Sequence, residues 1–328
     1  MNHHLSRNRR ALFLPALALA LALPALAQTD AYPNRPITLV VGYPPGGSTD
    51  LTGRTVADQL ARKLGVPVVV ENASGAGGAI AALKVSRAAP DGYTVFLGAN
   101  NEIAINRLIS PSTVKYSYKD FTPIGLVASQ PMVLVAGTST GIKDVAQFLK
   151  AVKTQPGRFS YGSSGVGTAL HLAGEMVKEQ GGLYLTHIPY RGVAPLTNDL
   201  LGGALEYGVF VLSSGLPHIR SGKVVAIGLT EKQRSASAPE IPALAEHPAL
   251  KNMDISVWFA LMAPPNLPEP ITAKLKRALA ETLQAPEFRR RLEDAGSRIA
   301  APGVDMERFL ADEDAKYQRI ADFARIKE

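Results

Sequence analysis

The sequence contains no cysteine among its 328 residues and only one tryptophan. Without thiols the chain cannot form disulfides, a thiol nucleophile, a cysteine-ligated zinc site or an iron–sulfur cluster. It also has no cysteine that could carry an N-terminal lipid anchor. Charged residues make up 19% of the chain and hydrophobic residues 46%, which is typical of globular proteins and not of disordered ones. The length predicts roughly two domains.

Histidine and clustered charge are also scarce. Beyond the first few residues there are four histidines, and none lies four positions from another: His171, His187, His218 and His247. This spacing does not favour a metal site. Apart from one run at 289–291, basic residues are scattered and have no interleaved aromatics, which does not favour nucleic-acid binding. Residues 312–314 (Asp-Glu-Asp) are interpreted as a solvated helix face. We expect no metal, no cofactor and no enzyme activity.

The first 27 residues have the pattern of a cleavable signal peptide. Its parts are three basic residues, an apolar segment and two small residues before the cleavage point: Arg7, Arg9 and Arg10, then 11–23, then Ala25 and Ala27. The apolar segment is shorter than the ~20 residues that span a bilayer; an uncleaved signal anchor is the alternative. We expect export to the periplasm with cleavage before Gln28. Loss of three arginines lowers the formal charge from +7 to +4. The remaining basic residues are too scattered along the sequence to indicate a polymeric partner.

The rest of the chain alternates short apolar runs with helical patterns. The first part predicts strands at 37–43, 66–70 and 94–97 with helices at 48–64 and 79–87 between them, which is the order of a doubly wound open sheet. A second unit of the same kind predicts strands at 132–136, 159–162, 185–189, 207–212 and 224–229, with helices at 145–152, 171–177 and 196–201. A late strand at 255–262 and helices at 271–283, 287–294 and 305–324 indicate that the chain returns to its first lobe.

The first unit contains a glycine-rich loop between a strand and a helix, residues 42–50 (Gly-Tyr-Pro-Pro-Gly-Gly-Ser-Thr-Asp). Glycines let a ligand approach the backbone, and the N–H groups and dipole of a helix start favour an anion. The loop lacks the lysine of a P-loop and the spacing of a dinucleotide fingerprint, which disfavours a nucleotide. An ordinary strand-to-helix turn is the alternative.

The second unit contains a similar loop, residues 161–168 (Tyr-Gly-Ser-Ser-Gly-Val-Gly-Thr). It does not fit the G-x-S-x-G nucleophile elbow, because Val166 stands where the second glycine should follow Ser164. Its serines are therefore interpreted as hydrogen-bond donors, and His171 could orient the loop or simply pack. Two such loops, one in each unit, predict a cleft that closes on a carboxylate.

Short motifs along the chain form an ordered set: 32–37 (YPNRPI), 44–50 (PPGGSTD), 75–78 (GAGG), 90–94 (PDGYT), 161–165 (YGSSG), 171–175 (HLAGE), 189–192 (PYRG), 199–203 (DLLGG) and 216–219 (LPHI). This set resembles the solute-binding proteins of tripartite tricarboxylate transporters, also called Bug-type periplasmic receptors. The resemblance covers essentially all of the chain after the signal peptide.

The resemblance implies an α/β protein with the type II periplasmic-binding-protein fold, in which two doubly wound α/β lobes are joined by a two-strand hinge. Lobe 1 would comprise 28–127 plus 253–328, and lobe 2 would comprise 128–252. The implied protein is a monomeric receptor that captures an organic carboxylate between its lobes and delivers it to membrane permease subunits.

The resemblance also implies ligand-binding residues, which are matched here by position. They belong to the two loops and to the segments beside them: Tyr43, Gly47, Thr49 and Asp50 in the first loop, Ser163, Gly167 and Thr168 in the second, Asn100 and Asn101 after the strand at 94–97, and Arg191 and Gly192 in a later turn.

One position departs from the family pattern. Family members often carry an aspartate in the cleft at the position of Phe210, where it could bind a ligand ammonium group. A phenylalanine there predicts a ligand with an apolar or aromatic body, such as an aromatic dicarboxylate, with Arg191 binding its second carboxylate. The alternative is that Phe210 is a core residue and the ligand an ordinary aliphatic di- or tricarboxylate.

Two other functions were weighed. An extracytoplasmic sensor that passes its signal to a sensor kinase would use the same closing lobes, so the sequence does not separate it from a transport receptor. A secreted α/β hydrolase would need the serine elbow that is missing.

Overall fold

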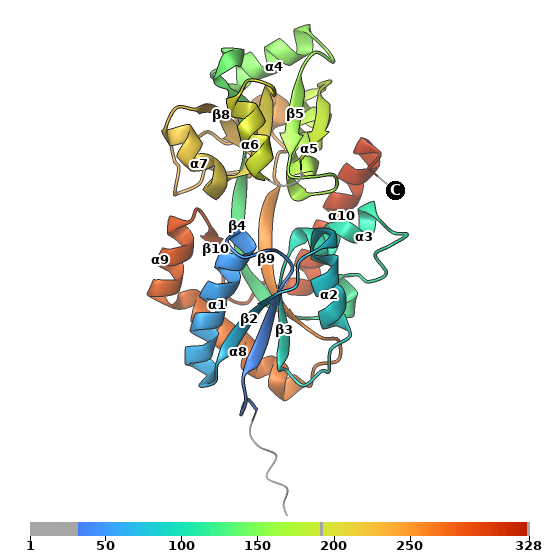
Figure 1. The fold of residues 1–328 in the computed structure, drawn as a ribbon, viewed down its shortest axis with the longest axis vertical. Coiled ribbons are helices and arrows are strands. Elements are labelled where there is room, and N and C mark those ends of the chain that lie inside the picture. Colours follow the sequence, from blue (N-terminus) through green and yellow to red (C-terminus); the bar gives the residue numbers. More distant parts are fainter. Residues whose placement is uncertain (1–31, 191–192, 327–328) are drawn as a thin grey trace, which may run out of the picture. The chain divides into compact units, whose positions relative to one another are not determined.

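The computed structural model describes residues 32–190 and 193–326. The fold described below is that of the unit that begins at residue 33 (Figure 1). None of the helices among the described residues combines the length and the apolar character that a membrane span requires.

The first sheet is mixed and follows the order β2-β1-β3-β9-β4. Its parallel strands are β1 (Ile37–Val41), β2 (Val68–Asn72) and β3 (Thr94–Ala99), connected by α1 (Ser48–Leu64) and α2 (Ala79–Ser86). Strand β1 is buried along most of its length because helices cover both faces of the sheet. Antiparallel β9 (Ser256–Ala263) lies between β3 and β4 (Thr122–Gly137). We call the part of the chain built on this sheet lobe 1.

The C-terminal segment completes lobe 1. It contains α8 (Glu269–Gln284), α9 (Pro286–Asp294), β10 (Arg298–Ile299) and α10 (Met306–Ala324). Helix α8 packs against α1 and β4, and α10 packs against β4 and also against α5 (Ala169–Gly181). Lobe 1 is thus built from both ends of the described chain.

The second sheet joins β4 to β7 (Tyr207–Val211), β8 (Val224–Leu229), β5 (Ser160–Ser163) and β6 (Thr186–Pro189). Its helices are α4 (Val145–Thr154), α5 (Ala169–Gly181), α6 (Val193–Leu201) and α7 (Leu212–Arg220). We call this part lobe 2. The predicted α/β fold class with two lobes is therefore confirmed.

Strand β4 belongs to both sheets, and Figure 1 shows β4 and β9 crossing from one lobe toward the other. Residues 122–131 of β4 pair with β9, whereas residues 132–136 pair with β7 on one side and residues 133–137 with β8 on the other. Thr230, which follows β8, connects β4 to the residue before β9. Its N–H donates to Met132 O (2.9 Å), and its hydroxyl donates to Ile255 O (2.6 Å). The residue boundaries given above for the two domains stay a prediction.

The elements that the sequence did not predict include the first half of β4 and helix α7. The first half of β4 was not predicted, since Pro123, Gly125 and Pro131 disfavour a regular strand. The strand accommodates them with register shifts next to Gly125 and Ala128. Helix α7 was not predicted either, because Pro217 lies inside it.

Candidate functional site

The first glycine-rich loop is held in place by Asp50, which is 4% exposed. Its carboxylate accepts hydrogen bonds from the N–H of Gly46 (2.9 Å), from Nε of Arg54 (3.0 Å) and from Nδ2 of Asn72 (2.9 Å). Burial raises the pKa of Asp50, but the hydrogen bonds from Arg54, Gly46 and Asn72 outweigh it and hold the pKa below its ordinary value. Asp50 therefore fixes the loop from within.

The start of α1 is left without a side-chain cap. Gly47 occupies the N-cap position, and a Cβ built on it would meet no atom within 4 Å. Gly46 before it has φ +93°, which favours glycine. The hydroxyl-bearing Thr49 is buried in the first turn of the helix. The first N–H groups of α1 are therefore available to an anion.

Tyr43 connects this loop to the segment after β3. Its hydroxyl donates to Oε2 of Glu102 (2.9 Å) and accepts from Nδ2 of Asn101 (3.2 Å). Glu102 is 1% exposed, and its Oε1 accepts from the N–H of Ala99 (2.7 Å). Burial raises the pKa of Glu102 to about 7, against the opposing effect of hydrogen bonds that favour its ionised form.

The second glycine-rich loop ends at Thr168, which caps α5. Its Oγ1 accepts from the N–H of His171 (3.3 Å) and donates to Gly165 O (2.9 Å). Gly167 has φ +71°, and a Cβ built on it would lie 2.9 Å from Cγ2 of Ile109. Ile109 ends α3 (Asn106–Ile109) of lobe 1. The second loop therefore contacts lobe 1 at a position that only glycine fits well.

His171 orients the second loop, which resolves the alternative left open by the sequence. Its Nδ1 accepts the N–H of Gly167 (3.0 Å), and its ring stacks on His187. Burial lowers the pKa of His171 to about 3 and that of His187 to about 4, so both rings are neutral at pH 7.

The hydroxyl of Ser163 lies 2.7 Å from Nε2 of His187 and 3.1 Å from Gly165 O. It also accepts the N–H of Gly165 (3.2 Å). The side chain is also fully buried. Ser163 therefore supports the loop from inside.

Asn101 brings the two loops together. Its Oδ1 accepts the N–H of Ala169 in lobe 2 (2.9 Å), while its Nδ2 donates to the hydroxyl of Tyr43 in lobe 1 (3.2 Å). Ala169 follows Thr168 directly in the chain and begins α5. Of the residues expected at the site, the structure therefore joins Tyr43, Asn101 and the Gly167–Thr168 turn.

Asn100 points elsewhere. It is 1% exposed, and its Nδ2 donates to Ser256 O (3.0 Å) and to the hydroxyl of Tyr317 on α10 (2.9 Å). The same hydroxyl accepts from Nε1 of Trp258, which also donates to Glu313 (2.8 Å). The interpretation of residues 312–314 as a solvated face was therefore wrong for Glu313, which forms hydrogen bonds in a buried polar cluster.

Phe210 lies in the core of lobe 2 and is 2% exposed. It belongs to a cluster of buried apolar side chains that includes Val133, Leu196, Leu200 and Ile241. This packing favours the alternative that Phe210 is a core residue. Arg191 and Gly192 lie outside the described residues.

Sequence reasoning did not single out Asn72, Glu102 or Ile109. Asn72 ends β2 and Glu102 follows β3, so both lie near the carboxyl ends of the two parallel strands that flank β1. Ligands of open α/β sheets bind at that edge. Polar residues directly after each predicted strand were the signal that could have found the first two.

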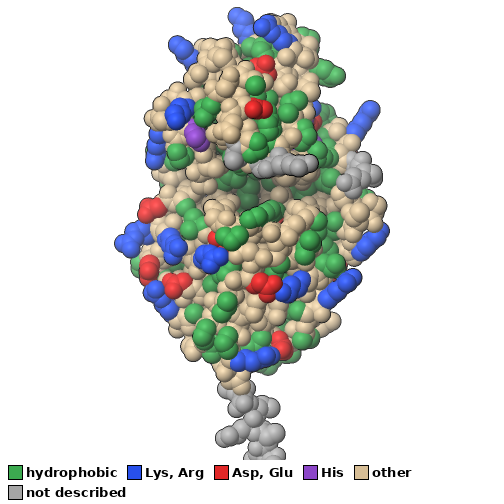
Figure 2. Space-filling model, viewed as in Figure 1, with side chains coloured by type: hydrophobic (Ala, Val, Ile, Leu, Met, Phe, Trp, Pro, Cys, Tyr) green, Lys and Arg blue, Asp and Glu red, His purple; other side chains and the backbone are tan. Residues whose placement is uncertain are grey.

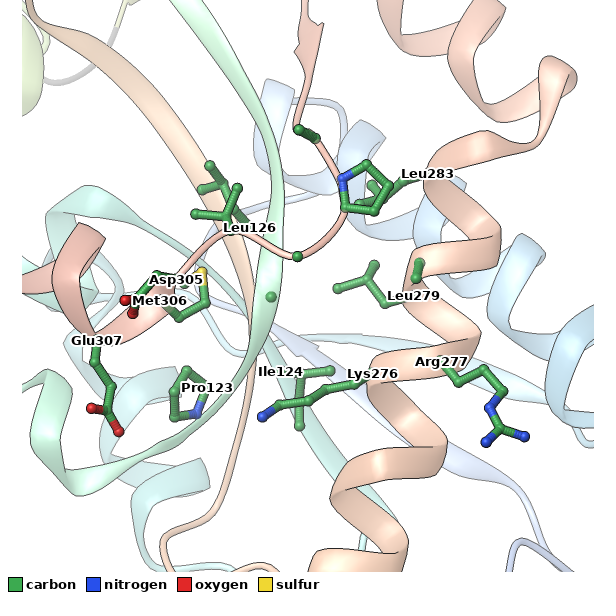
Figure 3. Close-up of a pocket in the computed structure, with 16 residues that line it drawn as sticks. Pro123, Ile124, Leu126, Lys276, Arg277, Leu279, Leu283, Asp305, Met306 and Glu307 are labelled. Atoms are coloured by element: carbon green, nitrogen blue, oxygen red, sulfur yellow. The ribbon is translucent and has the colours of Figure 1, made fainter.

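The largest of the cavities described lies away from these loops. It has a volume of about 560 Å³ and lies between α8, β4 and the segment before α10. In Figure 3, Ile124 and Leu126 of β4 lie between Leu279 of α8 and Met306 of α10. All of its lining residues belong to lobe 1, so this cavity does not lie between the two glycine-rich loops.

A smaller cavity lies beside the second loop. Its volume is about 390 Å³, and Val166, His171 and His187 of lobe 2 line it together with Ile109 and Arg325 of lobe 1. Within the part of the chain that the structure describes, there is no group of three or more histidine and acidic residues that could hold a metal ion. Figure 2 shows basic and acidic side chains intermixed on the face that is drawn.

Two α/β lobes that share a strand, with a helix N-terminus and a glycine-rich loop from each near their junction, define the periplasmic binding protein class. Residues 52–325 match the model of the tripartite tricarboxylate transporter family receptor, TctC, and the chain belongs to this family. The recognition made from the sequence motifs is confirmed.

Known proteins support this assignment over most of their length. Protein BugT of Bordetella pertussis is 33% identical over 293 residues, which cover 89% of this chain and 90% of BugT. The solved structure of R. palustris Rpa4515 with adipate has a TM-score of 0.80 at 30% identity and covers 89% of this chain and 98% of its own. MatC (Rpa3494) from Rhodopseudomonas palustris with bound malate has a TM-score of 0.76 at 29% identity, with coverages of 88% and 99%.

Proposed function

We propose that this chain is a periplasmic receptor that captures a dicarboxylate between its lobes and delivers it to the permease subunits of a tripartite tricarboxylate transporter. In this proposal the chain is exported, its leader is removed before Gln28, and it acts as a monomer without catalytic activity. The family membership supports the receptor role.

The observation that carries the proposal is the hydrogen-bonded path from Tyr43 through Asn101 to Ala169. This path joins the loop before α1 to the first turn of α5, so the N-termini of two helices from different lobes face one region. The first turn of α1 has no side-chain cap and can bind a carboxylate through its N–H groups, and the dipole of α5 adds to the attraction. Closing the lobes around the anion removes water and strengthens those bonds.

The ligand class that we favour is a dicarboxylate with a short aliphatic body. Two solved structures similar to this chain contain malate and adipate, which are both of this class. Arg191 is the candidate partner of the second carboxylate, because a guanidinium group binds a carboxylate with two parallel hydrogen bonds. The aromatic dicarboxylate suggested by the Phe210 position is the second ligand class, and it has lost support because that side chain packs in the core.

Binding can be measured by thermal shift and by isothermal titration calorimetry on the chain that begins at Gln28. The panel is malate, adipate, citrate, terephthalate, benzoate and aspartate. We expect the melting temperature to rise with malate or adipate, because a ligand that binds only the folded state stabilises it by RT ln(1 + [L]/Kd). A flat response to every carboxylate at millimolar concentration would reject the proposed function. A preference for terephthalate over adipate would reassign the ligand class.

A further inference from the structure

The side chain of Asn101 makes two directional contacts that belong to different lobes. It lies in the turn Asn101–Ile105, directly after β3 and Asn100. Its carbonyl oxygen meets the N–H of Ala169 at 2.9 Å, and its amide nitrogen meets the hydroxyl of Tyr43 at 3.2 Å. The amide group therefore bridges the region between the two glycine-rich loops.

The hydrogen bonds along this path have one direction. A backbone N–H can only donate, so Oδ1 of Asn101 must face Ala169 and Nδ2 must face Tyr43. The hydroxyl of Tyr43 can accept that bond because its own proton has an acceptor in Glu102 (2.9 Å) or in Gly77 O (3.3 Å). Glu102 is buried and its Oε1 accepts the N–H of Ala99, so the path ends on a side chain that is held in place.

The N–H of Ala169 belongs to the first turn of α5 and has no acceptor within the helix. The neighbouring N–H groups are satisfied inside lobe 2, that of Gly167 by His171 and that of His171 by Thr168. The N–H of Ala169 is different, because its acceptor comes from lobe 1. This bond exists only when the two lobes approach each other.

Other contacts between the lobes, among the described residues, do not join the two loops by a hydrogen bond; the ion pair of Arg298 with Glu231 (2.8 Å), for example, involves neither loop. Ile109 packs beside Gly167 through apolar contact. Arg319 on α10 pairs with Glu179 on α5 at 2.6 Å, but half of the Arg319 side chain is exposed and such pairs contribute little. Asn101 is therefore the contact that couples the two loops to each other.

We propose that Asn101 is a positioning residue that latches lobe 1 to lobe 2, and that it sets the fraction of closed molecules without discriminating among ligands. The inference rests on the proposed receptor function. When only a fraction of molecules is competent to bind, the apparent Kd equals the intrinsic Kd divided by that fraction. Weakening the latch therefore raises the apparent Kd of every ligand by the same factor, whereas loss of a direct ligand contact changes the Kd of different ligands by different factors.

The test compares Asn101→Ala and Asn101→Asp with the wild-type chain. Small-angle X-ray scattering of the ligand-free proteins reports lobe opening, and calorimetry reports Kd for malate and adipate. For Asn101→Ala we expect a larger radius of gyration and a rise in Kd of about three- to tenfold that is equal for both ligands, in line with the loss of one or two hydrogen bonds. Asn101→Asp keeps the acceptor for Ala169 and should restore the wild-type radius of gyration.

Asn106→Ala is the matched control. The Asn106 amide donates to Gly77 O (2.8 Å), a contact that stays within lobe 1, so its removal should leave the radius of gyration unchanged. Circular dichroism confirms that each variant is folded. An unchanged radius of gyration for Asn101→Ala, or a loss of affinity that differs between malate and adipate, overturns the latch. If the wild-type chain binds no carboxylate but the Asn101→Ala variant still has a larger radius of gyration than the wild type, the latch stands and the proposed function fails.

Discussion

The imidazole rings of His171 and His187 lie face to face, with centroids 3.6 Å apart and planes inclined by 12°. One ring accepts the N–H of Gly167 and the other contacts the hydroxyl of Ser163. The two rings thus form a neutral support beneath the second glycine-rich loop, and this support depends on both rings being uncharged.

The histidine pair predicts a loss of stability in mild acid. Burial lowers the pKa of His171 to about 3 and that of His187 to about 4, against about 6.5 in the unfolded chain. Between these values the unfolded chain binds more protons, so the free energy of unfolding falls as pH decreases from about 6.5 toward 4. In urea titrations, His171→Asn should show a smaller decrease between pH 7 and pH 5 than the wild type.

The buried carboxyl group of Glu102 predicts a pH dependence of the opposite sign, in which the free energy of unfolding falls as pH rises. Burial raises its pKa to about 7, so the folded chain holds a proton that the unfolded chain releases above about pH 4.5. The contribution of Glu102 therefore falls as pH rises from about 4.5 through 7, by as much as about 3 kcal/mol. Glu102→Gln removes this titration and keeps the size of the side chain. We expect it to gain stability relative to wild type at pH 8 and not at pH 4.5; equal differences at both pH values would contradict the assignment.

Thr168 predicts linked changes in stability and binding. Its hydroxyl caps α5 and contacts Gly165 O. Thr168→Ala should lower the free energy of unfolding by about 1 kcal/mol through loss of the cap. It should also weaken carboxylate binding about tenfold, because the first turn of α5 loses its fixed geometry. Thr168→Ser should restore both quantities. Thr197→Ala on α6, which removes a hydroxyl that bonds to Val193 O, is the control, and wild-type affinity in Thr168→Ala would remove Thr168 from the site.

The burial of Phe210 predicts that its substitution changes the stability of the protein but not its preference among ligands. The side chain is buried in the core of lobe 2, so Phe210→Ala should cost about 3–5 kcal/mol of unfolding free energy. Phe210→Leu keeps most of the apolar volume and should fold. We expect its ratio of affinities for adipate and terephthalate to equal that of the wild type. A changed ratio would return Phe210 to the ligand site.

The sequence predicted the fold more completely than the site. The apolar run of β1 and the stripe of Val56, Leu60 and Leu64 on α1 carry their own periodicity, so these elements were predicted nearly to the residue. The first half of β4 was missed because its prolines and Gly125 hide a strand whose pairing partner, β9, lies far along the chain. Local patterns cannot report such a pairing.

Within the site, residue type located the loops but not the roles of their side chains. Asp50 and Ser163 have polar groups that suit a ligand, yet both form hydrogen bonds with the backbone of their own loops. Asn100 and Asn101 are adjacent and chemically identical, but one joins the cluster around Tyr317 and the other reaches Ala169. Which way each amide points depends on partners more than 60 residues away, so the sequence alone could not separate them.

The position of β9 between β3 and β4 has a consequence for how the chain matures. Both flanking strands are synthesised early, and β9 begins only at Ser256, after all of lobe 2. A growing chain that ends before this residue therefore has a gap in the middle of its first sheet, with unpaired backbone on both sides. Lobe 1 cannot close that gap until lobe 2 has emerged, and pairings across so long a separation form slowly. The order of strands thus delays the tertiary folding of lobe 1 until late in synthesis.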